Sequence, residues 1–175
     1  MNNWIARAVE LGADAAQMIR PDQVVVAEWV RLKCQYGCGG YGECLTCPPH
    51  SPSSEVTRQM LAHYRQALLL CVEVPGGTWK EEEQQRRRLA EAVAALEREL
   101  FLAGYHRAWG MSAGPCPFCE TCNLPGPCHF PRLARPSMEA CGIDVYSTVR
   151  HAGWEIKVVQ TLEAPCRLFG LVLVE

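Results

Sequence analysis

Residues 67–74 read ALLLCVEV, and residues 78–103 read TWKEEEQQRRRLAEAVAALERELFLA. The first stretch is short and continuously apolar, which is typical of a strand that is buried on both faces. The second stretch has an apolar residue at every third or fourth position, so it predicts a long helix with one buried face. The residues of that face are Leu89, Val93, Leu96 and Leu100. A buried strand followed by a long helix indicates a sheet with helices packed against it.

The rest of the chain adds helices and strands around this unit. Helices are predicted over residues 3–19, after a cap at Ser53, and from a cap at Asp144 to near Gly153, and strands over residues 24–32, 106–112, 154–158 and 166–174. We therefore expect an α/β fold of the α+β kind, with a mixed sheet of about five strands and packed helices. Because no repeat or linker divides the sequence, residues 1–175 are expected to form a single domain.

The charge balance argues against two classes of partner. Seventeen Lys and Arg residues against nineteen Asp and Glu residues give a formal net charge of -2. A protein held chiefly by nucleic-acid phosphates or by an anionic membrane surface needs a basic excess, so we expect neither as a partner. The longest apolar run, residues 168–174, is too short to span a bilayer, and the first residues lack the apolar core of a signal peptide. We expect a cytoplasmic protein.

Cysteine is unusually frequent in this chain. Eleven of the 175 residues are cysteines, and an odd number of thiols cannot pair completely. A reducing cytoplasm also keeps thiols free. The sequence therefore favours metal or redox chemistry over a disulfide framework.

The strongest metal signal lies in a Pro-rich segment, residues 114–136. Cys116, Cys119 and Cys122 follow a Cys-x2-Cys-x2-Cys pattern, and Cys128 comes shortly after them. This spacing lets one tight loop bind three corners of a [4Fe–4S] cube, while a more distant cysteine binds the fourth. The prolines of the segment restrict its backbone before any metal binds.

A second set of cysteines lies in a Gly-rich segment, residues 34–52. It consists of Cys34, Cys38, Cys44 and Cys47. Cys47 is followed by a proline, and a Cys-Pro pair also ends bacterial ferredoxin motifs, in which that cysteine binds the other cluster of a pair. Two Cys-x2-Cys pairs, one from each segment, could instead build a zinc site of four thiolates. Both segments follow a predicted strand, so in a parallel sheet these two Cys-rich metal loops would meet at one sheet edge.

Five stretches resemble one known family over nearly the whole chain. They are VRLKCQYGC (30–38), YG (41–42), CPP (47–49), GPCPFC (114–119) and ARPSMEACGIDV (134–145). In this combination the sequence resembles the DUF2284 family of predicted metal-binding proteins. The resemblance implies a bacterial or archaeal cytosolic protein whose metal ligands are the matching cysteines, Cys34, Cys38, Cys47, Cys116, Cys119, Cys122, Cys128 and Cys141. Cys44 does not match a position of the family pattern.

Eight matching cysteines are the number that two [4Fe–4S] clusters require at four thiolates each. We expect two clusters, with Cys128 or Cys141 completing the set of three in the first segment, while a local quartet that uses Cys44 stays open. The expected role is electron transfer, or a redox accessory function for an unidentified redox protein partner. The alternatives are a zinc protein whose metal fixes the loops for partner binding, and an enzyme that binds substrate at an open cluster iron. The sequence assigns neither an enzyme activity nor an oligomeric state.

Four further residues are expected outside the metal sites. Cys71 and Cys166 lie in predicted strands, where a free cysteine behaves as a small core residue. His50 and His129 lie beside the cysteine motifs, and we expect them to be polar loop residues rather than ligands.

Overall fold

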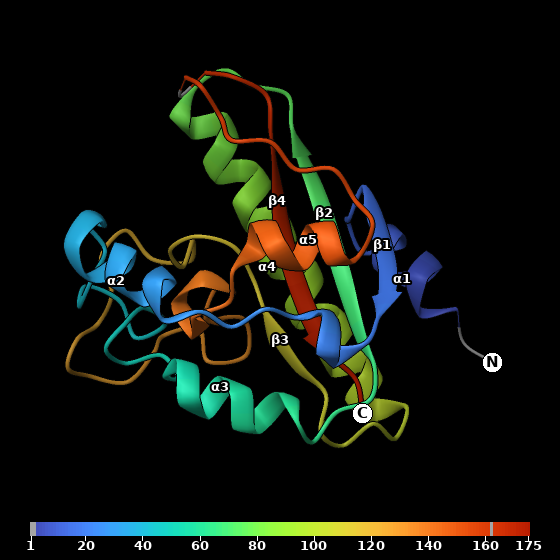
Figure 1. The fold of residues 1–175 in the computed structure, drawn as a ribbon. Coiled ribbons are helices and arrows are strands. Elements are labelled where there is room, and N and C mark those ends of the chain that lie inside the picture. The colour runs from blue at the N-terminus through green and yellow to red at the C-terminus, as the bar shows by residue number, and fades with distance from the viewer. Residues whose placement is uncertain (1–2, 162) are drawn as a thin grey trace.

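The computed structural model describes residues 3–161 and 163–175 and has one sheet as its framework (Figure 1). In the described residues the sheet has four strands in the order β1-β2-β4-β3, and each neighbouring pair is antiparallel. The strands are β1 (Ala15–Ile19), β2 (Ala67–Val74), β3 (Trp109–Met111) and β4 (Cys166–Leu173). The expected α+β class is confirmed, but the sheet is antiparallel rather than mixed.

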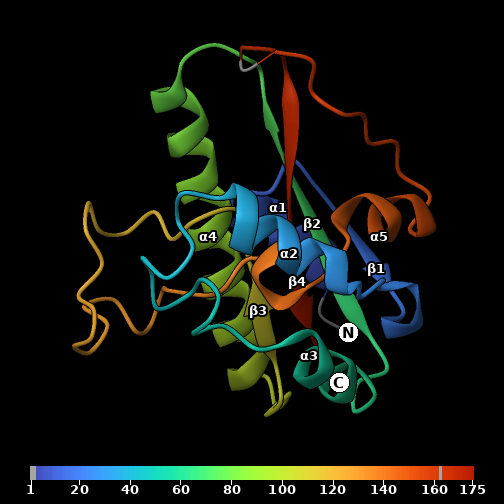
Figure 2. The same cartoon turned by 60° about the vertical axis from the view of Figure 1, so that its left-hand side comes forward.

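Helices cover both faces of this sheet (Figures 1 and 2). They are α1 (Trp4–Glu10), α2 (Glu28–Gly37), α3 (Ser54–Leu61), α4 (Trp79–Leu102) and α5 (Val145–His151), with single 3-10 turns η1 (Pro21–Gln23) and η2 (Glu139–Cys141). One apolar cluster lies between the sheet and α1 with α4, and another lies between the sheet and α3, α5 and η2. Side chains of β2 alternate between the two clusters. Leu68 and Leu70 lie in the cluster beside α1 and α4, and Leu69 and Cys71 lie in the cluster beside α3, α5 and η2. β2 is continuously apolar because both of its faces are buried.

The predicted strand–helix unit is confirmed with its boundaries. β2 spans the predicted residues 67–74, and α4 begins after Thr78. Thr78 and Glu81 form a reciprocal capping box at the start of α4. Ser53 and Asp144 also cap α3 and α5 as predicted, each accepting a hydrogen bond from a backbone N–H of the first turn.

Residues 3–19 form two elements instead of the single predicted helix. α1 ends at Glu10, the chain turns at Gly12 with φ +120°, and residues 15–19 pair with β2. A positive φ of this kind suits glycine, which lacks a Cβ. The apolar spacing of residues 15–19 fits either a helix or a strand, and pairing with the open edge of β2 decides in favour of the strand.

The strand predicted over residues 24–32 is wrong. Only Val26 makes an isolated bridge, with Ile143, and α2 begins two residues later at Glu28. The three consecutive valines favoured a strand, but most of the residues that follow are good helix formers. Cys34 therefore lies on a helix and not in a loop.

Near the C-terminus only one of the two predicted strands, 154–158 and 166–174, is confirmed. β4 confirms the strand over residues 166–174 almost in full, whereas residues 154–158 form no strand. Trp154 and Ile156 instead pack individually against the apolar cluster beside α5. Alternating apolar residues can thus reach a core without pairing in a sheet. The third predicted strand, over residues 106–112, is confirmed in shorter form as β3.

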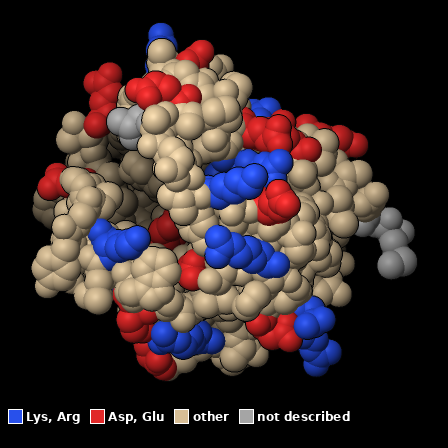
Figure 3. All heavy atoms as spheres, turned by 45° about the horizontal axis from the view of Figure 1, so that its top comes forward, with Lys and Arg blue, Asp and Glu red and all other residues tan. Residues whose placement is uncertain are grey.

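Charges of both signs are interspersed on the face shown in Figure 3. No helix among the described residues is both long enough and apolar enough to cross a membrane.

Candidate metal centre

The two Cys-rich loops lie side by side on the β3 side of the sheet (Figures 1 and 2). We call residues 38–53 the first loop and residues 112–138 the second loop. The backbone N–H of Leu45 in the first loop donates a hydrogen bond to Sγ of Cys122 in the second, over 3.4 Å. The predicted meeting of the two loops is confirmed, although the parallel strands expected to produce it are absent from the described residues.

Five thiols from both loops line one cavity, which we call the five-thiol cavity. They belong to Cys44, Cys116, Cys119, Cys122 and Cys128. Phe118 and Phe130 complete its apolar wall, with their ring centroids 6.1 Å apart. Thus the four cysteines predicted in the second loop come together, and Cys44 from the first loop joins them.

Neighbouring thiols affect one another in this cavity. Burial raises the pKa of Cys116, a hydrogen bond with the backbone of Phe118 opposes this, and the nearby thiols of Cys128, Cys44 and Cys119 raise it further. Burial also raises the pKa of Cys44, with the next largest contribution from Cys122. Without metal the thiols of Cys44 and Cys116 stay protonated at neutral pH, so metal binding at either must displace a proton.

Three further thiols lie on α2 or in the first loop, those of Cys34, Cys38 and Cys47. Burial raises the pKa of Cys47 to about 12, and Cys44 and Cys38 add to the effect. Burial also raises the pKa of Cys34, followed by the neighbouring Cys38. Eight thiols thus lie on α2 and in the two loops, and we call them the thiol series. Its members are Cys34, Cys38, Cys47, Cys44, Cys122, Cys116, Cys119 and Cys128.

Backbone N–H groups already point at several of these sulfur atoms. Gly40 donates to Cys38 Sγ and Phe130 donates to Cys128 Sγ, each over 3.4 Å. Leu45 donates to Cys122 across the loops, as described above. Hydrogen bonds of this kind stabilise a thiolate and tune the redox potential of a metal that it binds.

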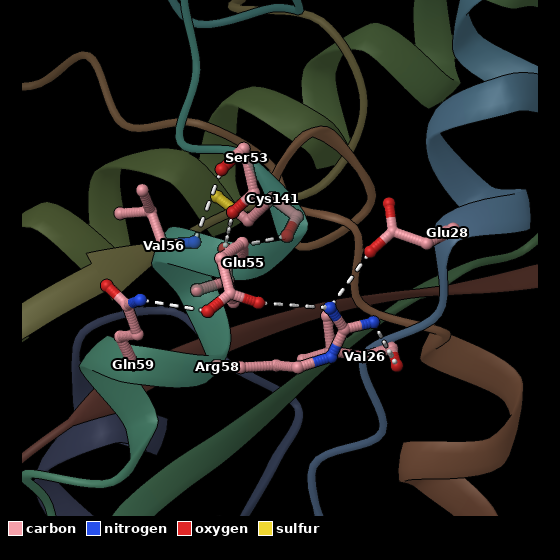
Figure 4. A network of polar contacts seen from close by, with 9 residues as sticks. Val26, Glu28, Ser53, Glu55, Val56, Arg58, Gln59 and Cys141 are labelled. Carbon is pink, nitrogen blue, oxygen red and sulfur yellow. Dashed lines mark hydrogen bonds and ion pairs between the residues drawn. The ribbon is translucent and has the colours of Figure 1, made fainter.

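Cys141, the eighth predicted ligand, lies apart from the thiol series. Its side chain is fully buried in the apolar cluster beneath α3. Figure 4 shows it next to α3, where the hydroxyl of Thr57 donates to the Cys141 carbonyl oxygen over 2.7 Å. Burial raises the pKa of the Cys141 thiol to about 12, and the other groups that influence it are Arg31 and Glu139. Its role as a ligand stays a prediction.

Arg31 on α2 connects the elements that surround the first loop. Its Nη1 donates to Ser51 Oγ and to the Pro52 carbonyl oxygen, each over 2.9 Å, and to the Ala140 carbonyl oxygen over 2.6 Å. The Ser51 hydroxyl donates to the same Ala140 oxygen over 2.7 Å. One guanidinium thus fixes α2, the end of the first loop and η2 relative to one another.

The second loop is attached to α4 by two arginines. Arg135 forms a two-point ion pair with Glu97, with nitrogen–oxygen distances of 2.6 and 2.7 Å. Both side chains are largely buried, at 18% and 14% exposed. Arg87 lies over the ring of Phe118, 5.4 Å from its centroid. The long helix predicted from sequence is therefore the support on which the second loop rests.

Four residues were expected to lie outside the metal sites. Cys71 is buried in β2, and Cys166 is half-buried at the start of β4. His129 lines the five-thiol cavity but is exposed, and His50 is exposed in the first loop.

Cys44 matches no position of the family pattern, so the sequence alone does not assign it as a ligand. The signal that could have identified it is its Cys-x2-Cys spacing with Cys47. Its contact with Cys122 depends on how the two loops fold together, which local spacing does not reveal.

Among residues 3–161 and 163–175, no three His, Cys, Asp or Glu side chains converge closely enough to hold a single metal ion.

Comparison with protein-family models gives one match, DUF2284, described as a predicted metal-binding protein, over residues 17–174. Searches of curated proteins and of solved structures gave no match. The matched region contains both Cys-rich loops, all four strands except the first two residues of β1, and the supporting helix α4. The chain therefore belongs to the DUF2284 family of predicted metal-binding proteins.

Proposed function

We propose that this protein binds two [4Fe–4S] clusters and transfers electrons to or from a redox protein partner. The observation that carries the proposal is the five-thiol cavity, which is lined by sulfur donors from two distant parts of the chain, with the Leu45 N–H of the first loop donating to Cys122 Sγ of the second. Soft thiolate donors in this number favour iron–sulfur clusters over harder, oxygen-bound metals.

One cluster would be held by the second loop. Cys116, Cys119, Cys122 and Cys128 supply four thiolates around the five-thiol cavity. The buried ring of Phe118 limits access of water to the sulfur atoms there, whereas the neighbouring ring of Phe130 is exposed. Such shielding, together with N–H donors to sulfur, is how a protein adjusts a cluster's potential.

The other cluster would be held next to α2. Cys34, Cys38 and Cys47 supply three thiolates, and a fourth donor must come from elsewhere. Cys34 lies on the last turns of a regular helix, so one ligand is fixed by the fold and not by the loop alone. The Arg31 hydrogen bonds hold that helix to the end of the first loop.

Several features of the chain suit electron transfer. When bound, a [4Fe–4S] cluster accepts or donates one electron. Cys38 is exposed and most other thiols of the series are half-buried, so a partner protein can approach the metal sites closely. The ion pair of Arg135 with Glu97 and the hydrogen bonds of Arg31 keep the ligand loops in place when the site changes charge.

Single-cysteine variants test this proposal. Protein purified and reconstituted without oxygen is titrated with dithionite and followed by electron paramagnetic resonance. The native chain should take up about two electrons, one for each cluster. Cys119→Ser should lose about half of the iron and one of the two signals.

Cys71→Ala is the matched control, because Cys71 is buried in β2 and away from the loops. It should keep both signals and lose only about 1 kcal/mol of packing energy. Equal loss of iron from both variants, or a native protein that binds zinc and takes up no electrons, would contradict the proposal.

A further inference from the structure

Glu139 presents a carboxyl oxygen whose environment is unusual for a folded protein. The residue begins η2, directly before the buried Ala140 and Cys141. Its Oε2 is inaccessible to solvent and has no hydrogen-bond partner. Burial raises the pKa of this carboxyl group, and hydrogen bonds from the backbone N–H of Glu139 and from Ser137 oppose the rise. Burial therefore disfavours the charged carboxylate unless a cation compensates its charge.

The nearby arginines do not supply that compensation. In the described residues no ion pair includes Glu139. Arg31 donates to two carbonyl oxygens and a hydroxyl, and Arg86 pairs with Glu82. Both guanidinium groups are therefore engaged elsewhere. Lys33 and Arg150 line the same cavity as Glu139, but no ion pair in the described residues joins either of them to it.

Glu139 lies beside the thiols at the α2 end of the series. Cys34, Cys38 and Glu139 line one cavity between α2 and α5, and Figure 3 shows a hollow on this side of the molecule. The charge of Glu139 is among the influences that raise the pKa of Cys34, after burial and Cys38. The unpartnered carboxyl group therefore lines one cavity with two thiols of the set of three, those of Cys34 and Cys38.

We propose that the carboxylate of Glu139 is the fourth metal ligand of the set formed by Cys34, Cys38 and Cys47. This inference rests on the proposed function and completes the cluster next to α2. A metal at this position offsets the charge of the buried carboxylate, and the carboxylate supplies the donor that the three thiols lack.

Three other side chains compete for this role. Cys44 and Cys128 line the five-thiol cavity, together with three other thiols. The Cys141 side chain is fully buried in the apolar cluster beneath α3. Of the four candidates, Glu139 alone lines the cavity of Cys34 and Cys38.

A carboxylate ligand has a chemical consequence. An oxygen donor is harder than thiolate and binds iron of a cluster less firmly. The iron held by Glu139 is then the corner at which an external ligand, such as a small thiol, can replace a protein ligand. The other corners, held by thiolates, resist such exchange.

Three full-length variants test the assignment, each reconstituted without oxygen. Glu139→Gln keeps the size of the side chain but removes the anionic donor. The iron content of this variant should fall by at least one atom per chain and at most by the iron of one whole cluster. One of the two paramagnetic signals of the reduced protein should also change. Cys44→Ala and Cys141→Ala should keep the iron content of the native chain.

Stability of the metal-free protein separates ligation from a structural role. Glu139→Gln should leave the metal-free chain at least as stable as the native one, because burial favours the neutral form of the Glu139 carboxyl group and the amide is neutral as well. It should reduce the stabilisation that metal binding adds. If Glu139→Gln keeps its full iron content and unchanged paramagnetic signals, the proposal is overturned. If Cys44→Ala or Cys141→Ala then loses iron, the fourth ligand is the thiol removed in that variant.

The outcome for the native chain keeps this inference distinct from the proposed function. If the native chain holds two clusters and Glu139→Gln keeps both, only the Glu139 assignment fails. If the native chain holds zinc and no iron, the proposed function fails, and equal zinc content in the native and Glu139→Gln chains then overturns the Glu139 assignment as well.

Discussion

Replacing Arg31 by methionine should destabilise the protein before any metal is bound. Arg31 Nη1 donates to three oxygens, those of Ser51, Pro52 and Ala140, at 2.9, 2.9 and 2.6 Å. Methionine retains most of the side-chain length but has no N–H donor. The substitution therefore leaves α2, the end of the first loop and η2 without their common hydrogen-bonding group.

The magnitude follows from the protons that this nitrogen carries. One Nη1 has two N–H protons to share among the three acceptors. A hydrogen bond from a charged donor contributes about 1.5 kcal/mol at the low end of its usual range, so the loss is about 3 kcal/mol. The Ala140 oxygen keeps its bond from the Ser51 hydroxyl, which limits the loss.

Urea unfolding of the metal-free, reduced protein measures this change. With a slope of about 2 kcal/mol per molar urea, the midpoint of Arg31→Met should fall by about 1.5 M. Lys33→Met is the matched control on the same helix, since Lys33 is exposed and only lies over the ring of Trp29 at 5.2 Å. Its effect should stay below about 1 kcal/mol. Equal midpoints for the two variants would refute the reasoning about Arg31.

Two further substitutions test the supports of the ligand loops by the same measurement. Gly142→Ala should lower the free energy of unfolding by about 3 kcal/mol, because Gly142 has φ +80° and an added Cβ would overlap a side chain of α3. Gly153→Ala is the control and should cost only about 1 kcal/mol, because Gly153 has φ +83° but open space around it. Equal costs would show that the overlap at Gly142 does not matter. Glu97→Gln should lower the free energy of unfolding by about 2 kcal/mol, because it breaks the largely buried ion pair with Arg135. Glu91→Gln, in an exposed ion pair, should change it by less than about 0.5 kcal/mol. A Glu97 effect as small as that of Glu91 would show that this ion pair does not hold the second loop.

Elements with strong local signals could be predicted from the sequence. Residues 67–74 are apolar at nearly every position, and Thr78 with Glu81 marks the start of α4 by a reciprocal cap. These signals depend on neighbouring residues alone, so tertiary structure does not change their meaning. The segments that were misassigned, residues 15–19 and 24–32, have apolar patterns that suit either a helix or a strand. For the first segment, pairing with β2 decides the outcome, and no local pattern reports it.

The candidate site was predictable to the extent that spacing defines it. The Cys-x2-Cys-x2-Cys pattern identified the second loop, and its thiols do line one cavity. The contact of Cys44 with Cys122 and the position of Glu139 beside Cys34 arise only when separate segments pack together. Burial of Cys141 beneath α3 is likewise a property of the packed structure. Residue type and spacing therefore indicated the chemistry, while packing decides which donors are close together.

The central claim is that the thiol series holds iron–sulfur clusters. The most direct test is the content of iron, acid-labile sulfide and zinc per chain in protein purified without oxygen. Two cubes require about eight iron and eight sulfide per chain, with broad visible absorption that dithionite bleaches. Stoichiometric zinc without sulfide, in a colourless protein, would contradict the claim.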